Sequence, residues 1–591
     1  MQNAETVLGV LRDRGRKGLP CNELYRQMFN RELYLQAYGR IYANHGAMTP
    51  GTSAETADGM SEDKIDTIIE AMRNERYRFS PVRRIHIPKK NGKLRPLGLP
   101  SWSDKLVGEV VRLLLEAYYE PTFSDHSHGF RPGRGCHTAL RHVEVSWTGT
   151  TWFIEGDISD CFGSLSHEVM VRILSENIHD NRFLRLIKQM LTAGYLEDWK
   201  YHQTLSGCPQ GGVVSPILSN IYLHKLDVYV ETVLIPQYTR GERRKPNPEY
   251  ERRRARMARA RARGDRDEAR DLRRSLRRIP SVDPQDPGYR RLRYTRYADD
   301  HLLGFIGPKA EAEAIKDQLA RFLRDDLALE LNPSKTLITH ARTRAARYLG
   351  YEITVQHCDD KLTRGRRMVN GVVALRVPLD VIKAKRAPYR RRGKPWHRPA
   401  LQNLDDYDIV ATFGAEYRGI VGYYLLAADV WRLDDLRWYA LTSMLKTLAA
   451  KHQSTVSKMA IKYKAKIETR YGLRTCFEAR VHRNNKQDLV ARFGGIPLVR
   501  DKDTVLIDRV PQPAPHPRKE LIHRLLTRRC ELCGDPGKVL VHQVRKLASL
   551  GESGPGQPAW ATLMATKRRK TLVVCANCHN VIHAHPVMNA A

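Results

Sequence analysis

Stretches with a helical pattern of apolar residues alternate with short extended runs along this chain. Residues 23–47 are largely polar and helical in pattern, whereas residues 82–100 form extended runs broken by proline and glycine. Within the second stretch, Asn91-Gly92 is typical of a tight hairpin turn. Strands and helices are then mixed as far as about residue 355. The first helix of this mixed region is predicted from apolar residues on one face, at Val107, Val110, Val111, Leu114 and Leu115.

An arginine-rich insertion interrupts this pattern at residues 240–290. Its first part, through residue 278, contains almost no large apolar residues and so lacks a stripe that could face a core. We expect either a lone helix or disorder there. We interpret the insertion as RNA-binding, because guanidinium groups match phosphate geometry. A solvated, charge-rich spacer is the alternative.

The last third of the chain divides into a helical region and a small module. Residues 380–470 have a helical pattern, and the run 436–448 within them is amphipathic. The proline-rich stretch 511–517 predicts a stiff linker. The module after it contains four of the ten cysteines, as two Cys-x-x-Cys pairs.

The charge of the chain is unusual. Its 591 residues include 100 Lys plus Arg against 65 Asp plus Glu, a formal net charge of +35. Such an excess attracts polyanions, so nucleic acid is the expected partner; a basic but inert surface is the alternative. No run of about 18 apolar residues occurs, and the N-terminus lacks an apolar secretory core. We therefore expect no membrane association and a reducing, cytoplasmic location.

Three aspartates follow or join short apolar strands. Asp157 ends one strand, while Asp299 and Asp300 separate two further strand-like runs, so a hairpin would place the pair in its turn. Nucleotidyl transfer uses two Mg²⁺ ions about 4 Å apart, and such hard cations take carboxylate oxygens. The sequence therefore predicts a two-metal site; an aspartate pair that only caps a turn is the alternative.

The sequence Tyr297-Ala298-Asp299-Asp300 between apolar strands resembles the active site of reverse transcriptases. Further blocks resemble that family in the same order: IPKKNGKLRPLG from residue 87, HGFRPGRGC from 128, GCPQGGVVSP from 207, LNPSKT from 331 and YLGY from 348. The resemblance implies an RNA-directed DNA polymerase with Asp157, Asp299 and Asp300 as metal ligands. It also implies nucleotide contacts for Lys89, Arg95, Phe162, Gln210, Gly211 and Lys335.

These implied contacts differ in kind. Arg95, and with it Lys89, would clamp the triphosphate. Phe162 would be the steric gate that favours deoxynucleotides, although core packing is an alternative for its ring. Lys335 would protonate or neutralise pyrophosphate, with a plain surface lysine as the alternative.

The blocks are most similar to those of bacterial group II intron-encoded proteins, and the resemblance covers nearly the whole chain. Residues 23–51, 279–291 and 417–452 look like that family's N-terminal extension, approach to the palm and maturase or thumb domain. The resemblance implies group II intron RNA, target DNA and dNTPs as partners, and activity in both splicing and retrohoming. Two alternatives are a splicing-only maturase and a reverse transcriptase of another retroelement. The intact aspartates argue against the first, and the thumb blocks and C-terminal module against the second.

The C-terminal module combines two kinds of metal ligand. Cys530, Cys533, Cys575 and Cys578 have the spacing of a tetrahedral Zn²⁺ site, and redox chemistry is the weaker alternative. The interleaved segments resemble HNH endonucleases, which implies that His542, His579 and His583 hold a further, Mg²⁺-like cation. The family usually has a second histidine, the general base, where this chain has Gln543, and glutamine takes no proton at neutral pH. Cleavage by His542 alone, impaired cleavage and a DNA-binding zinc module without cleavage remain open.

Together these features predict an α+β right-hand polymerase with an α-helical thumb and a zinc-stapled ββα module. We expect the N-terminal extension and the start of the fingers at residues 1–80, and the fingers and palm at 81–360. The thumb or maturase domain is expected at 375–475, followed by a DNA-binding region and linker at 476–520. The HNH-like zinc domain is expected at 521–591.

Overall fold

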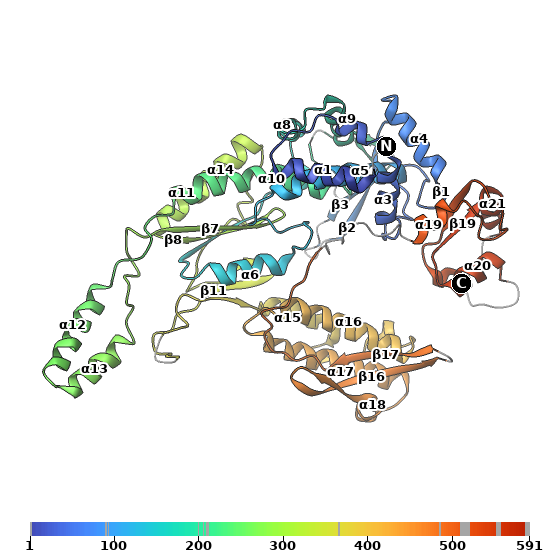
Figure 1. Cartoon of the computed structure of the whole chain (residues 1–591). Helices are drawn as coiled ribbons and strands as arrows, with labels where there is room; N and C mark the ends of the chain where they lie inside the picture. Colours follow the sequence, from blue (N-terminus) through green and yellow to red (C-terminus); the bar gives the residue numbers. More distant parts are fainter. Residues whose placement is uncertain are drawn as a thin grey trace.

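The chain forms three bodies and a projecting pair of helices (Figure 1). A computed structural model describes residues 3–88, 92, 94–198, 200–204, 206–207, 212–363, 367–483, 486–508, 520–550 and 557–585. The largest body holds the N-terminal helices and the central sheet, a second is mainly helical, and the C-terminal module lies against the first. No helix among these residues combines the length and apolar character needed to cross a bilayer.

The N-terminal helices pack around one long helix, α5 (Trp102–Tyr119), which carries the predicted apolar face. The other helices of this body are α1 (Ala4–Arg16), α2 (Leu24–Gln27), α3 (Arg31–Ile41), α4 (Glu62–Arg73), α8 (His167–Ser175) and α9 (Asn181–Leu191). The hairpin predicted at residues 82–100 is present as β2 (Val82–Pro88) and β3 (Leu94–Leu99). Gly92 has φ +79°, as a tight turn requires, while Asn91 lies outside the described residues. Two short strands, β5 (Tyr195–Glu197) and β6 (Lys200–His202), complete this sheet.

The central sheet is antiparallel, in the order β7-β8-β4-β9. Its strands are β4 (Trp152–Gly156), β7 (Arg291–Tyr297), β8 (Asp300–Ile306) and β9 (Ile338–His340). Side chains alternate between two cores: Ile154 and Leu303 face the N-terminal body, whereas Phe153 and Leu302 face the second body. Both faces are therefore covered, by α10 (Ser215–Tyr229) and α14 (Lys309–Leu327) on one side and by α6 (Cys136–Ser146) on the other (Figure 1).

The arginine-rich insertion is a helical hairpin, which corrects the expectation of a lone helix or disorder. Helix α12 (Pro248–Ala262) packs on α13 (Arg266–Leu276) and the pair projects from the body (Figure 1). The seam is narrow and uses small side chains, since Ala260 and Ala269 are buried. Acidic residues pair with the arginines, as Glu268 does with both Arg256 and Arg263. These ion pairs and the alanine seam replace the apolar stripe that the sequence lacks.

The second body joins a helical unit to two small sheets. Its helices are α15 (Leu379–Arg386), α16 (Asp406–Tyr424), α17 (Asp434–Lys451) and α18 (Val456–Tyr463), and α17 contains the amphipathic run predicted at 436–448. One sheet comprises β10 (Ala346–Tyr348), β11 (Tyr351–Val355) and β12 (Val373–Arg376). The other comprises β15 (Lys464–Thr469), β16 (Gly472–Arg483) and β17 (Lys486–Gly494). The predicted boundary at residue 475 falls inside β16, and Phe493 is buried in the same core as α16.

The C-terminal module has the predicted ββα arrangement, with an addition. Strands β18 (Val539–Gln543) and β19 (Thr571–Cys575) pair and lead into α21 (Ala576–Ala584). The third strand of their sheet is β1 (Met60–Ser61), which comes from the other end of the chain. The remaining helices and strands are α11 (Ile235–Gln237), β13 (Arg390–Arg391), β14 (Lys394–Pro395), α19 (Glu520–Leu526) and α20 (Ala559–Lys567).

Candidate active site

The central sheet brings the three predicted aspartates to one end. Asp157 directly follows β4, while Asp299 and Asp300 lie at the turn between β7 and β8. Strands β4 and β8 are antiparallel neighbours with Gly156 opposite His301. The register therefore places Asp157 beside Asp300, with the two carboxyl groups within hydrogen-bonding reach.

The turn is closed by unusual backbone geometry. Ala298 adopts a left-handed conformation with φ +55°. Gly129 packs against it so closely that a Cβ there would lie 2.4 Å from the Ala298 nitrogen. Likewise, a Cβ on Gly156 would lie 2.0 Å from the His301 ring. These two glycines allow the segments around the aspartates to approach each other.

The charges at this end of the sheet suit a cation. Burial raises the pKa of Asp299, and the neighbouring charge of Asp157 adds to the effect. Burial, with the charges of Asp299 and Asp157, raises the pKa of Asp300 to about 7. The Lys335 ammonium donates a hydrogen bond to Oδ2 of Asp157 at 2.8 Å. Clustered carboxylate oxygens where burial penalises negative charge are the donors that Mg²⁺ prefers, so the residues fit a divalent cation.

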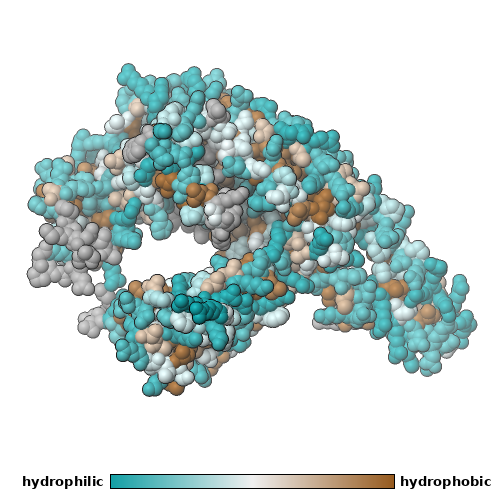
Figure 2. Space-filling model, turned by 180° about the vertical axis from the view of Figure 1, so that it is seen from behind, coloured by the Kyte–Doolittle hydropathy of each residue, from teal (hydrophilic) through white to brown (hydrophobic). Residues whose placement is uncertain are grey.

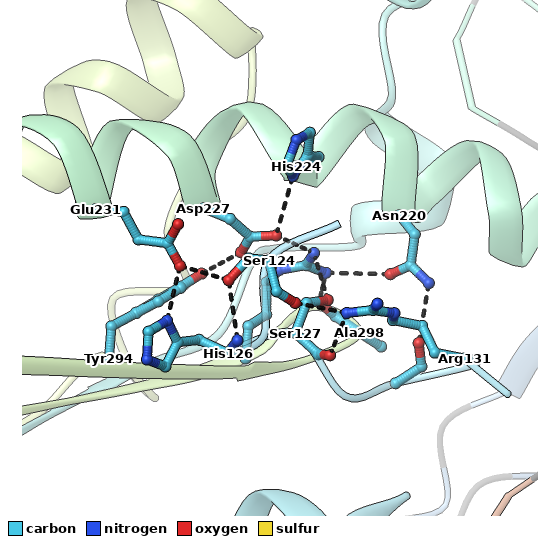
Figure 3. A network of polar contacts seen from close by, with 12 residues as sticks. Ser124, His126, Ser127, Arg131, Asn220, His224, Asp227, Glu231, Tyr294 and Ala298 are labelled. Carbon is cyan, nitrogen blue, oxygen red and sulfur yellow. Dashed lines mark hydrogen bonds and ion pairs between the residues drawn. The ribbon is translucent and has the colours of Figure 1, made fainter. Parts of the chain in front are cut away.

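A buried ion pair supports the turn from behind. Arg296, on β7, and Asp227, on α10, are both fully buried and joined by two hydrogen bonds of 2.7 and 2.6 Å (Figure 3). The hydroxyl of Tyr294 donates to the same carboxylate at 2.8 Å. Burial alone would raise the pKa of Asp227, but the adjacent Arg296 charge holds it well below its usual range. The pair is therefore ionised and fully desolvated.

The remaining donors of Arg296 reach the catalytic turn itself. Its Nη1 donates to the carbonyl of Ala298 at 2.8 Å and to the side chain of Asn220 at 3.2 Å. Asn220 in turn donates to the carbonyl of Gly129 at 2.9 Å. Figure 3 shows these side chains converging from α10 and from the loop at Ser127 onto the strand that carries the turn. One guanidinium thus holds the backbone atoms adjacent to the aspartates.

The sequence did not single out Arg296, Asp227 or Asn220. A charged side chain is rarely fully buried, so Arg and Asp are normally interpreted as surface residues. The available signal was the position of Asp227 in α10, where apolar residues occur on all sides rather than on one stripe.

Three of the six predicted nucleotide contacts lie within the described residues. Phe162 is half-buried in α7 (Cys161–Ser164), with its ring 6.3 Å from that of Phe130. Arg95 is exposed on β3. Lys335 lies at Asp157, as described above. Lys89, Gln210 and Gly211 lie outside the described residues.

Gly207, the first residue of the block 207–216, packs against the Phe162 loop. Gly207 has φ +89°, and a Cβ there would lie 2.7 Å from the carbonyl oxygen of Phe162. Its nitrogen donates to the carbonyl of Leu165 at 2.8 Å. Phe162 and Gly207, which are 45 positions apart in the sequence, are therefore adjacent in space.

The segment after β17 returns to this site, a contact that no pattern in the sequence predicts. Asp508 accepts a hydrogen bond from the hydroxyl of Tyr297, the residue two positions before Asp299. Its nitrogen donates to the carbonyl of Arg134 at 3.1 Å, and Leu506 donates to His137 at 3.1 Å. Figure 2 shows an open space between the first body and the helical second body.

The C-terminal module contains two clusters of metal-ligating side chains. The thiol sulfurs of Cys530, Cys533, Cys575 and Cys578 lie within 4.8 Å of one another, which fits a tetrahedral Zn²⁺ site. Burial would raise the pKa of Cys530, but hydrogen bonds from backbone amides lower it to about 6, which favours the thiolate. The second cluster unites the three predicted histidines with Asp58, which the sequence did not single out.

Three parts of the chain match known protein families. Residues 87–239 match a family model described as reverse transcriptase (RNA-dependent DNA polymerase). Residues 379–494 match one for the type II intron maturase, and residues 530–579 match one for the AI2M/AI1M-like HNH endonuclease.

Relatives from bacteria and yeast align with most of the chain. The group II intron-encoded protein LtrA of Lactococcus lactis is 37% identical over 585 residues, covering 95% of this chain and 96% of its own. A 91 kDa protein in the cob intron of Schizosaccharomyces pombe is 33% identical, over 95% of this chain and 70% of its own. Protein YkfC of Escherichia coli is 33% identical over 54% of this chain and 80% of its own.

Proposed function

Because this chain belongs to the family of group II intron-encoded proteins, with reverse transcriptase, maturase and HNH endonuclease domains, we propose that DNA synthesis occurs at the end of β4 and the β7–β8 turn. The observation that supports this proposal best is the register of β4 and β8, which sets Asp157 beside Asp300. Asp157, Asp299 and Asp300 would hold two Mg²⁺ ions. When bound, these ions activate the primer 3′-hydroxyl and stabilise the leaving pyrophosphate.

Protein side chains would position the reactants around these carboxylates. Arg95, on the exposed face of the β2–β3 hairpin, would clamp the triphosphate with parallel hydrogen bonds. Phe162 would exclude a ribose 2′-hydroxyl. Lys335 would leave Asp157 and neutralise charge on the pyrophosphate, which its exposed position at the site permits. Lys89, Gln210 and Gly211 would contact the nucleotide, as their resemblance to the reverse transcriptase blocks implies.

The domain arrangement would be that of a right hand. Residues 1–80 would form the N-terminal extension, 81–360 the fingers and palm with the insertion at 240–290, and the helical body the thumb. We extend the thumb or maturase domain to Gly494, because β16 and β17 share its core. Residues 495–520 would then be the linker, and 521–591 the HNH domain with its Cys₄ zinc.

Binding of intron RNA follows from the maturase domain, and we propose that the RNA is that of the chain's own group II intron. The net charge of +35 supports RNA binding. The arginine-rich helical hairpin α12–α13 would contribute, since it projects away from the body (Figure 1). Target DNA would be bound after splicing, during retrohoming. Crosslinking in cells, followed by sequencing of the bound RNA, would identify the intron.

Primer extension on an RNA template with pure protein tests the polymerase assignment. Wild-type protein should make Mg²⁺-dependent DNA, and Asp299→Ala should abolish it. Asp317→Ala provides a matched control, because Asp317 is an exposed aspartate on α14. No product from wild-type protein, with splicing still stimulated, would indicate a splicing-only maturase instead.

A further inference from the structure

The histidine cluster of the HNH domain has a fourth member from the opposite end of the chain. Asp58 lies just before β1, while His542 lies in β18, one residue before its end, and both His579 and His583 lie on α21. One ligand atom of each residue lies within 4.8 Å of the others. The individual distances are short. Oδ2 of Asp58 lies 2.8 Å from Nε2 of His583 and 3.3 Å from Nε2 of His579, and the two Nε2 atoms are 3.3 Å apart.

These separations match a coordination sphere. Ligand atoms placed about 2.0–2.1 Å from a tetrahedral Zn²⁺ are roughly 3.3 Å from one another. His542 completes the set, with Nδ1 3.1 Å from Oδ1 of Asp58. His542 is buried, and in the described part of the chain its Nε2 makes no hydrogen bond. A buried imidazole nitrogen without a hydrogen-bond partner is costly unless a metal binds it.

Asp58 is held in place by the sheet. Gly59 donates to the carbonyl of Val541 at 2.9 Å, and Met60 pairs with Val541 in the β1–β18 ladder. The nitrogen of Gln543 donates to Oδ1 of Asp58 at 2.7 Å. Behind this ladder, Met60 and Val541 belong to one hydrophobic core. The carboxylate therefore reaches the histidines from a packed interface.

Gln543 occupies the position where HNH endonucleases usually have their general base. Its side chain donates to the carbonyl of Tyr42 at 2.8 Å, in the same N-terminal region that supplies Asp58. Catalytic zinc sites keep three protein ligands and one open position, whereas structural sites use four. Here Asp58 lies at the fourth ligand position, and Gln543, which stands where the general base would be, contacts the N-terminal region instead.

We propose that Asp58, His542, His579 and His583 form a closed four-ligand site for a divalent transition metal, which ties the N-terminal extension to the C-terminal module. Imidazole with one carboxylate suits Zn²⁺. In this state the metal joins two ends of the chain and offers no position for a DNA phosphate. The site does not depend on the polymerase assignment.

Metal content of full-length protein tests the site. After dialysis against a weak chelator, wild type should retain two zinc ions per chain, one at the cysteines and one here. Asp58→Asn should retain one, with at least tenfold weaker affinity for the second, because even losing a hydrogen-bond partner of a ligand weakens binding about 10–100-fold. Asp63→Asn is the matched control: it removes the ion pair with Lys538 across the same interface and should keep both ions.

Hydrogen exchange provides an independent readout. Zinc should slow exchange at residues 58–61 in wild type and in Asp63→Asn, but not in Asp58→Asn. His583→Asn repeats the test at a side chain that is 54% exposed and so should not disturb folding. One zinc per chain in wild type, or two in Asp58→Asn with unchanged affinity, would overturn the proposal. Primer extension on the same samples reports separately on the polymerase.

Discussion

Replacing Arg296 with methionine should damage both the stability and the chemistry of the palm. The substitution leaves Asp227 fully buried without its guanidinium partner, with the Tyr294 hydroxyl and, at 3.9 Å, the His224 ring still beside it. Removing one partner of such a pair costs about 3–5 kcal/mol. Because every 1.4 kcal/mol is a factor of ten, amides of β7 and β8 that exchange through local opening should lose roughly a hundredfold to a few thousandfold protection.

The double variant Arg296→Met with Asp227→Leu separates stability from positioning. It contains no unpaired buried charge, so much of the exchange protection should return. It still lacks the hydrogen bond to Ala298 that orients the turn, so kcat for primer extension should remain about 100-fold low, because an ångström of misplacement has an effect of that size.

Arg324→Met is the matched control for the comparison of the single and double variants. Its ion pair with Asp325 is about 60% exposed, and loss of such a pair changes stability by less than about 1 kcal/mol. Normal protection in Arg296→Met would refute the desolvation argument. Recovery of both protection and kcat in the double variant would show that Arg296 has no positioning role.

Three further predictions concern the metal site, the insertion and the nuclease module. Since burial and neighbouring charges raise the pKa of Asp300 to about 7, its proton stabilises the fold at low pH and this stabilisation is lost as the pH rises through 7. Mg²⁺ should therefore raise the melting temperature more at pH 8 than at pH 6, a difference that Asp300→Asn should reduce. Arg240 and Arg290 are joined by two backbone hydrogen bonds, so a short loop can replace the residues between them. This deletion should preserve primer extension but weaken RNA binding. The slope of log affinity against log salt concentration should become shallower by about 0.7–0.9 per lost phosphate contact, and an unchanged slope would exclude the insertion from the RNA interface. Gln543→His combined with Asp58→Ala should nick DNA faster than either single variant, because both the base and an open metal position are then present; equal rates would contradict this reading of the module.

The sequence predicted those parts of the site that depend on local pattern. The strands before Asp157 and after Asp299 have clear apolar runs, the segment before Asp299 is strand-like, and the structure contains all three. The four cysteines were equally clear, because their ligand spacing is local in each pair. In each case neighbouring residues along the chain carried the information.

What the sequence could not show was which distant charges meet. Arg296 and Asp227 are 69 positions apart, and Asp58 and His583 are 525 positions apart. No periodicity distinguishes a buried charge from a solvated one, since burial is decided by the partner that another segment supplies. The helical hairpin of the insertion was missed for the same reason, because Glu268 and the alanines stabilise it only once two helices face each other.

The two candidate cation sites differ in how the chain balances their charge. At the palm, the aspartates repel each other, and Asp157 forms an ion pair with Lys335, whose side chain is 63% exposed. A cation that binds there competes with this exposed ammonium, so the site can load and release metal with each nucleotide. In the module, Asp58 adds a negative charge to three imidazoles and is held by a packed strand. A cation that binds there gains a ligand instead of displacing one, which favours a resident ion that holds the chain ends together.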